Sequence, residues 1–381
     1  MNKTSISAKQ METTIALYLI GSSLVSGGSS RAKQDTWLCV LAALVMIIPM
    51  IWVHSEILKL YPGQDYFQNI FRAVGRPAGT AVSVLLIINT LNIGAIVLRL
   101  FSEFVHIVNM TETPIIAIMV CISAVTVYVL SNRLYVLARL SKFVFPFLLV
   151  AVAITIVLSY KEMDWNHLKP VLHSKPADLL GGVLSSFTIP YSEIVICAPM
   201  FGALDRKAKI FPSFLNGVFL AFIIVFSANL RNMLVLGYST EVFNFPSYES
   251  VSVISLGEFF TRIEVLIGIN LLLAGFIKGG VLLFSTCQGL AKVFGYKDYE
   301  PLVAPVSLLI LTASILISDS TVEMYRWIED LPYYSMPFQV FLPILVLVIG
   351  KIRKKIEKSK KQGKEPAKEG KESIPLKPQK S

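Results

Sequence analysis

Hydrophobic positions in this chain gather into long, nearly uninterrupted apolar runs that are separated by short polar stretches. A helix that crosses the hydrocarbon core of a bilayer needs about 20 apolar residues, and the runs approach this length. The pattern predicts an all-α integral membrane protein with about ten transmembrane helices. The predicted spans lie near residues 12–29, 37–57, 80–106, 114–131, 143–160, 180–201, 211–236, 263–287, 302–318 and 336–350.

Two of the predicted spans contain residues that interrupt a helix. The first span holds Gly21-Ser22-Ser23 and then Gly27-Gly28-Ser29-Ser30. The sixth holds Gly181-Gly182, Ser185-Ser186, Pro190 and Pro199. Glycine costs about 1 kcal/mol relative to alanine inside a helix, and proline removes a helical hydrogen bond. Backbone groups freed in this way are tolerated at membrane depth only where protein or a watery cavity satisfies them. The alternative is that the small residues merely allow the helices to pack closely.

The two interrupted spans are five apart, so the chain divides into two halves of five spans, residues 12–160 and 180–350. Interrupted helices in matching positions of two halves are typical of a transporter-like site at the membrane midplane. We therefore expect a 5+5 inverted repeat with broken spans 1 and 6, and a ligand between the two breaks. Residues 1–350 form one transmembrane domain in this interpretation.

Ionisable side chains inside a span are costly in a bilayer and normally face the protein interior. Glu193 lies one helical turn after Pro190, where it could bind a ligand amine, carry a proton, pair with a basic residue or bond to loosened backbone. Lys278 lies near the middle of the eighth span, where its ammonium could replace a bound cation or form a structural ion pair. Arg99 and Glu103 are four residues apart, so we expect a structural ion pair along one helix.

The candidate substrate-binding residues surround the two breaks, and two further residues of the third span would close one side of the site. They are Gly21, Ser22, Ser23, Asn92, Gly94, Ser186, Phe187, Thr188, Pro190, Tyr191 and Glu193. Lys278 is the candidate coupling residue, standing in for an ion site.

Composition and charge exclude a soluble protein. Hydrophobic residues make up 54% of the chain and charged residues only 16%, whereas soluble domains average about 25% charged residues. The net charge of +10 comes mainly from residues 351–381, where 12 Lys and Arg stand against 4 Asp and Glu. This tail lacks aromatic residues and apolar periodicity, so we expect a disordered segment that contacts lipid headgroups and not nucleic acid.

The basic residues also predict an orientation. Segments on the same side of the membrane as the N-terminus carry 25 Lys and Arg, and the segments on the other side carry 7. Since cytoplasmic loops are enriched in Lys and Arg, we expect both termini in the cytoplasm. The chain has no phosphate-binding, serine-hydrolase or dinucleotide motif, and its four cysteines and four histidines form no metal pattern. We expect no enzyme activity, cofactor or metal.

Several stretches also resemble a known family. They are ISAKQ (6–10), AKQDTWL (32–38), YPGQDYFQNI (61–70), FPSYESVSVISLGEFFTRIEVLIGI (245–269), FIKGGVLLF (276–284) and CQGLAKVFGYKDYEPLVAP (287–305). Within the last three, the residues that match the family pattern in order are Tyr248, Gly257, Glu258, Phe259, Arg262, Glu264, Lys278 and Pro305. The chain resembles the endospore germination permeases, the B subunits of nutrient germinant receptors, in the amino-acid/polyamine/organocation transporter superfamily.

This resemblance implies a leucine-transporter-type arrangement in the inner membrane of a spore. It implies a subunit that binds a nutrient (an amino acid, sugar or nucleoside) and triggers ion release together with a larger A subunit and a lipoprotein C subunit. The sequence departs from the family pattern after span 1, which lacks the usual proline, and in span 6, which is richer in hydroxyl groups. The alternatives are a permease that transports its ligand and an ion-conducting or scaffold subunit.

Overall fold

The computed structural model describes residues 5–26, 30–241, 243–253, 264–318 and 321–362. Regular structure in these ranges is helical, apart from one isolated parallel bridge between Ile6 and Leu204. Seven of the described helical segments are long and apolar enough to cross a membrane, and two shorter apolar helices cover residues 115–131 and 300–316. Together with the first helix, these segments correspond to the ten predicted spans. The protein is a multi-pass membrane protein.

The helices of the first half follow the predicted order. They are α1 (Ala8–Ser26), α2 (Thr36–Leu60), α4 (Arg76–Val108), α5 (Ile115–Ser131) and α6 (Leu134–Leu158), with η1 (Ser30–Asp35) and α3 (Tyr66–Val74) between them. Helix α6 begins nine residues before the predicted edge of its span. The apolar run starts only after Arg139 and Lys142, but the helix continues through this basic stretch at the end of the bundle.

The second half begins with the sixth span, which consists of four short pieces. They are α7 (Pro176–Thr188), η4 (Tyr191–Glu193), α8 (Ile194–Cys197) and η5 (Ala198–Ala203). The spans that follow are α9 (Ile210–Leu236), α11 (Glu264–Phe294), α12 (Val303–Leu316), and a last one made of α13 (Thr321–Met336), η8 (Pro337–Phe341) and α14 (Leu342–Gln362). The connecting elements are η2 (Ser159–Glu162), η3 (Trp165–Leu168), η6 (Gly237–Glu241), α10 (Pro246–Ser252) and η7 (Glu300–Leu302).

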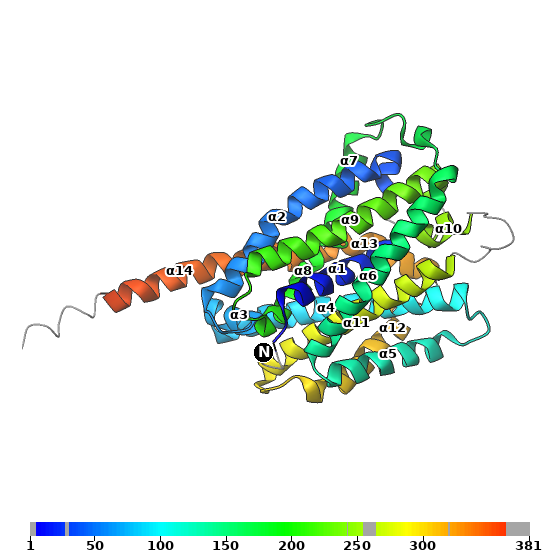
Figure 1. Cartoon of the computed structure of the whole chain (residues 1–381). Helices are drawn as coiled ribbons and strands as arrows, with labels where there is room; N and C mark the ends of the chain where they lie inside the picture. Colours follow the sequence, from blue (N-terminus) through cyan, green and yellow to red (C-terminus); the bar gives the residue numbers. More distant parts are fainter. Residues whose placement is uncertain (1–4, 27–29, 242, 254–263, 319–320, 363–381) are drawn as a thin grey trace, which may run out of the picture.

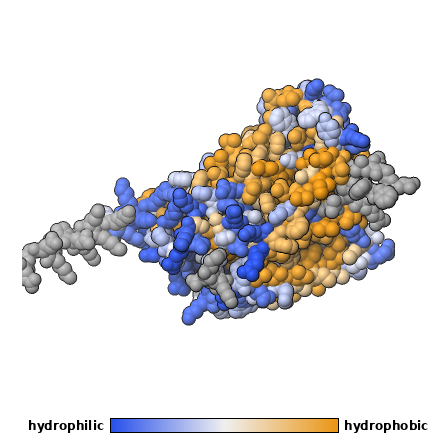
Figure 2. All heavy atoms as spheres, viewed as in Figure 1, coloured by the Kyte–Doolittle hydropathy of each residue, from blue (hydrophilic) through white to orange (hydrophobic). Residues whose placement is uncertain are grey.

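Helix α1 lies at the centre of the bundle, packed against α6, α9 and α11 (Figure 1). Its residues Ile15–Ile20 are fully buried. Close approach to α9 depends on Gly217, where a Cβ atom would lie 2.8 Å from the Cβ of Ile15. Large apolar side chains on the outer helices, such as Val45, Phe143 and Val348, are exposed on the bundle surface. Figure 2 shows a hydrophobic belt between hydrophilic ends on the face in view, which is the surface that lipid requires.

We expected the basic C-terminal segment to be disordered from residue 351. This expectation is wrong for its first part, because α14 continues without interruption to Gln362. Its polar half extends away from the bundle (Figure 1). Two lysines attach it to the end of α2. Lys354 donates a hydrogen bond to the carbonyl oxygen of Leu60 at 2.6 Å, and Lys351 forms an ion pair with Glu56 at 3.5 Å.

Candidate ligand and coupling site

The predicted interruption of the sixth span is present. Helix α7 ends at Thr188, the Ile189–Pro190 peptide is cis, and the chain continues as a single turn of 3-10 helix before α8. Pro190 has no backbone N–H to donate, and the two hydroxyls beside it bond to local carbonyl groups. Thr188 donates to Leu184, and Ser192 donates to Thr188 at 3.3 Å. The break therefore places backbone and hydroxyl groups in the interior of the bundle, because all residues from 190 to 201 are buried.

The first span differs from the expectation at Gly21-Ser22-Ser23, where α1 is one continuous helix. Of the second predicted interruption, residues 27–29 lie outside the described residues. Gly21 faces α11, and a Cβ atom there would lie 3.1 Å from the carbonyl oxygen of Ala274 and 3.2 Å from the Cβ of Lys278. The hydroxyl of Ser23 donates to the carbonyl of Leu19, one turn earlier. The side chain of Ser22 lies outside the described residues. At Gly21 and Ser23, the small residues serve close packing and local bonding inside a helix.

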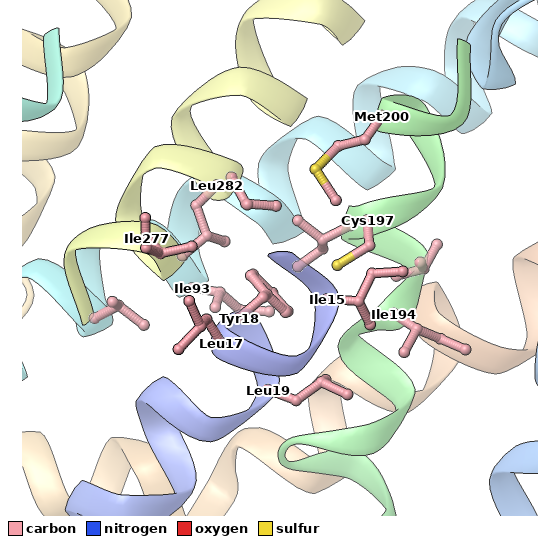
Figure 3. Close-up of a cluster of buried hydrophobic side chains, with 14 of the residues drawn as sticks. Ile15, Leu17, Tyr18, Leu19, Ile93, Ile194, Cys197, Met200, Ile277 and Leu282 are labelled. Carbon is pink, nitrogen blue, oxygen red and sulfur yellow. The ribbon is translucent and has the colours of Figure 1, made fainter. Parts of the chain in front are cut away.

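The structure brings Glu193 and Lys278 together. Glu193 is 1% exposed and Lys278 is 0% exposed, and the ammonium of Lys278 forms an ion pair with Oε2 of Glu193. The hydroxyl of Tyr18 donates to the same carboxylate oxygen at 3.2 Å, and the Lys278 ammonium lies 4.5 Å from the centre of the Tyr18 ring. Figure 3 shows Tyr18 on α1 between α11 and the sixth span, among Ile93, Cys197 and Ile277. Tyr18, Glu193 and Lys278 thus form one buried cluster without net charge, which joins α1, η4 and α11.

This pairing decides between the roles that the sequence left open for Glu193. Its carboxylate is held by Lys278 and Tyr18, so it is not a free counter-charge for a ligand amine. The Lys278 side chain does not extend to the membrane surface. Its ammonium lies in the protein interior beside α1. A buried ion pair of this kind is expensive to desolvate and strongly destabilising to break.

Unpaired polar atoms lie around the same break. The hydroxyls of Ser186 and Tyr191 and the side-chain nitrogen of Gln339 are buried without a hydrogen-bond partner among the described residues. Gln339 comes from η8 in the last span, and its side-chain oxygen accepts a hydrogen bond from Ser192. Since buried polar atoms normally have partners, these three atoms are available to a bound molecule or to water. The sequence offered one signal for Gln339, a carboxamide inside a predicted span, but nothing showed which span it would face.

The two residues of the third span face other partners than expected. The side chain of Asn92 donates to the hydroxyl of Tyr334 on α13 at 3.2 Å. Gly94 lies against α12, where a Cβ atom would be 3.4 Å from Ile310. Ile93, between them in the sequence, is the α4 residue that joins the buried cluster around Tyr18 (Figure 3). Asn92 and Gly94 therefore leave our candidate site. Phe187 is buried at the end of α7.

The remaining predicted charges have simpler roles. Arg99 and Glu103 form an ion pair of 2.8 Å along α4, as their spacing indicated. Gly257, Glu258, Phe259 and Arg262 lie outside the described residues, as does the side chain of Glu264. Within the described part of the chain, no group of three or more His, Cys, Asp or Glu residues could hold a metal ion.

A family model described as spore germination protein matches residues 5–322 of the chain. The chain belongs to this family. Spore germination protein KB of Bacillus subtilis (strain 168) is 26% identical over 371 residues, which cover 96% of this chain and 99% of that protein. Spore germination protein YndE of the same organism is 23% identical over 365 residues, covering 93% and 99%. The family match ends before Gln339, but both relatives extend over nearly the full length.

Solved structures of transporters share the fold. The structure of MHP1, a nucleobase-cation-symport-1 family transporter in a closed conformation with bromovinylhydantoin bound, has a TM-score of 0.67 at 10% identity, covering 90% of this chain and 78% of that one. The structure of MhsT in complex with L-phenylalanine has a TM-score of 0.61 at 12% identity, covering 88% and 87%. This spore germination protein therefore has the leucine-transporter-type 5+5 fold, and its family is one of non-enzymatic membrane proteins.

Proposed function

We propose that this protein is the nutrient-sensing subunit of a spore germination receptor. A small nutrient binds at the break of the sixth span, and the change that binding favours is passed to partner subunits, which release ions. The observation that carries the proposal is the buried cluster of Glu193, Lys278 and Tyr18, next to unpaired polar atoms, at the interrupted helix of a transporter fold.

The charge balance of the cluster supports a ligand without net charge. Glu193 and Lys278 neutralise one another, so the break presents hydrogen-bonding groups and no free charge. The hydroxyls of Ser186 and Tyr191 can donate or accept, and the side-chain nitrogen of Gln339 can donate. A sugar or a nucleoside fits this set, and a zwitterionic amino acid fits it where its carboxylate also reaches the Lys278 ammonium. We propose Ser186, Phe187, Thr188, Pro190, Tyr191 and Gln339 as the lining of the site.

The ion pair joins helices of different spans, and it can therefore link ligand binding to a change in their arrangement. Lys278 extends from α11, Glu193 belongs to η4, and Tyr18 and Gly21 lie on α1. The Lys278 ammonium provides a fixed cation between α1 and α11. A ligand shifts such an arrangement only if it binds one conformation better than another. A nutrient carboxylate or hydroxyl that competes for the Lys278 ammonium would supply this difference in affinity.

We further propose the setting in which this subunit works. It lies in the inner membrane of the spore with both termini in the cytoplasm, and it assembles with a larger A subunit and a lipoprotein C subunit. The excess of basic residues on the side of the N-terminus and in α14 supports this orientation. The family membership supports the assembly, because relatives over the full length are spore germination proteins.

Germination of spores that lack the gene tests the proposal. We expect these spores to lose the decrease in optical density for one nutrient class among amino acids, sugars and nucleosides, and the wild-type gene to restore it. A normal response to every class, by spores that also lack the related receptors, would contradict a sensing role.

Replacing Tyr191 by phenylalanine tests the position of the site. One lost hydrogen bond is worth about 1 kcal/mol, so we expect the nutrient concentration for half-maximal germination to rise about fivefold at an unchanged protein level. Tyr128→Phe is the matched control, because Tyr128 is exposed on the outer surface of α5. An unchanged midpoint in both Tyr191→Phe and Ser186→Ala would remove the break of the sixth span from the binding site.

A permease that transports its ligand is the second candidate, and the fold similarity to MHP1 and MhsT favours it. Uptake of a radiolabelled nutrient by the full chain in liposomes separates the two functions. Saturable uptake that is lost in Tyr191→Phe would establish transport, whereas binding without uptake is the result expected of a sensor.

A further inference from the structure

A cavity lies apart from the break of the sixth span, between α4, α12 and the junction of α13 with η8. Its volume is about 480 Å³, and apolar side chains such as Ile88, Leu316 and Phe338 form most of its wall. Three polar side chains, Asn89, Asn92 and Tyr334, also line it. A mainly apolar pocket of several hundred Å³ with a few convergent polar groups is the usual form of a small-molecule site.

The carboxamide of Asn89 is the decisive feature of this cavity. Asn89 is 4% exposed, and both its side-chain oxygen and its side-chain nitrogen lack a hydrogen-bond partner among the described residues. Asn92 differs, because it already donates to Tyr334. A buried amide normally has partners for both atoms. Both atoms of Asn89 are inaccessible to solvent, so an occupant of the cavity meets this donor and this acceptor when the Asn89 side chain turns toward it.

The residues that line the cavity also indicate that an occupant is uncharged and that it enters from the membrane. No lining residue carries a charge, so an ionised group would have no partner. Ile88 is 58% exposed and Leu316 is 78% exposed, and both lie on the apolar outer surface of the bundle. The cavity therefore opens toward the hydrocarbon of the membrane, from which an apolar molecule can enter without crossing a polar layer.

We propose that this cavity binds an uncharged amphipathic molecule that partitions into the membrane and carries a hydroxyl or carboxamide group. Such a group donates to the oxygen of Asn89 and accepts from its nitrogen, while the apolar part of the molecule fills the space between α4 and α12. Two sources have this chemistry: a small alcohol or amide dissolved in the membrane, and a hydroxyl-bearing lipid such as a diacylglycerol. The site is independent of the nutrient site and of its role in germination.

Photolabelling of the full chain in lipid nanodiscs tests the proposal. The probe is a ten-carbon primary alcohol that carries an aliphatic diazirine, and a diacylglycerol with the same diazirine in one acyl chain forms a second arm. We expect saturable labelling of peptides from α4 and the end of α12, competed by 1-decanol and not by decane. Saturation by the alcohol alone would assign the site to small molecules, and saturation by the diacylglycerol would assign it to lipid.

Three variants identify the cavity. Asn89→Leu keeps the volume but removes both hydrogen-bonding atoms, so we expect about tenfold weaker labelling. Ala313→Phe fills the space from α12 and should abolish labelling. Asn229→Leu is the matched control, because Asn229 is a half-buried asparagine on α9 whose amide bonds to the Val225 carbonyl, and labelling should be unchanged. Size-exclusion chromatography verifies that each variant is folded.

Two results would overturn the proposal. Labelling that spreads without saturation over the outer faces of α5 and α6 would mean that the probe samples bulk lipid. Competition by decane as strong as that by 1-decanol, with wild-type labelling in Asn89→Leu, would mean that the cavity accepts any acyl chain and that the unpaired carboxamide has no ligand.

Discussion

Replacing Lys278 alone by methionine is expected to remove most of the protein from the spore membrane. The substitution leaves the buried Glu193 carboxylate without its cation, and among the described residues the Tyr18 hydroxyl is its remaining hydrogen-bond donor. Breaking a buried pair by removing one member costs about 3–5 kcal/mol, a large part of a total folding stability of about 5–15 kcal/mol. The measurement is the protein level in spore membranes by immunoblot, with the melting temperature in detergent.

The double variant Glu193→Gln/Lys278→Met separates stability from signalling. A neutral pair of similar volume replaces the ion pair, and such replacements are often neutral or stabilising. We expect the protein level to return toward wild type, while the nutrient response stays absent because the charge contact between α11 and the broken span is gone. A normal response in the double variant would show that the ion pair is structural only.

Lys292 provides the control on the same helix. It forms a 3.6 Å ion pair with Asp65 near the end of α11, but its side chain is partly exposed. The Asp65 carboxylate also accepts hydrogen bonds from the backbone N–H of Gln68 and the side chain of Gln288, so Lys292→Met should lower the protein level much less than Lys278→Met. If Lys278→Met were as abundant as Lys292→Met, the contact between Glu193 and Lys278 would not be a main source of stability.

Valine at Gly21 is expected to lower the protein level rather than shift the nutrient dose response. Even the first carbon of a side chain there would meet the backbone of α11 at Ala274 and the Cβ of Lys278 at 3.1–3.2 Å. Two further methyl groups force α1 away from α11, and overpacking of this kind typically costs about 1–3 kcal/mol. Moving α1 away from α11 also disturbs the contact between Tyr18 and Lys278. The Gly21→Val protein that still reaches the membrane should therefore respond poorly even at saturating nutrient.

Gly279→Val is the matched control for this experiment. Gly279 lies on α11, one residue after Lys278, and no atom lies within 4 Å of a Cβ built there. We expect a near-normal protein level and response. If Gly21→Val instead kept its level and raised only the nutrient concentration needed, Gly21 would line the ligand site, as its sequence pattern first suggested.

The spans and the sixth-span break could be predicted because their causes are local. Twenty apolar residues in a row and a proline beside hydroxyl residues determine where a helix can cross and where it must stop. Glycine and serine alone do not stop a helix that is packed on all sides, which is why α1 continues through Gly21 and Ser23. The tail also contained a helical signal, since Ile352 and Ile356 are spaced by one turn.

The direction that each side chain faces could not be predicted. Helix α4 is largely buried, so its apolar pattern does not identify one inward face, and Asn92, Ile93 and Gly94 meet three different sets of neighbours. The contact between Ser192 and Gln339 depends on how two spans separated by 147 positions pack together. The Glu193–Lys278 pair was one of several open alternatives for the same reason.

The last helix has a mechanical consequence. Helix α14 starts directly after η8, which contacts the broken span through Gln339, and it is attached to α2 near its middle by Lys351 and Lys354. With about 1.5 Å of rise per residue, each arm on either side of this attachment is about 15 Å long. Helix α14 also packs against α3, so we expect a sideways movement of η8 to be passed along this continuous helix to its contacts with α2 and α3 and on to its basic end.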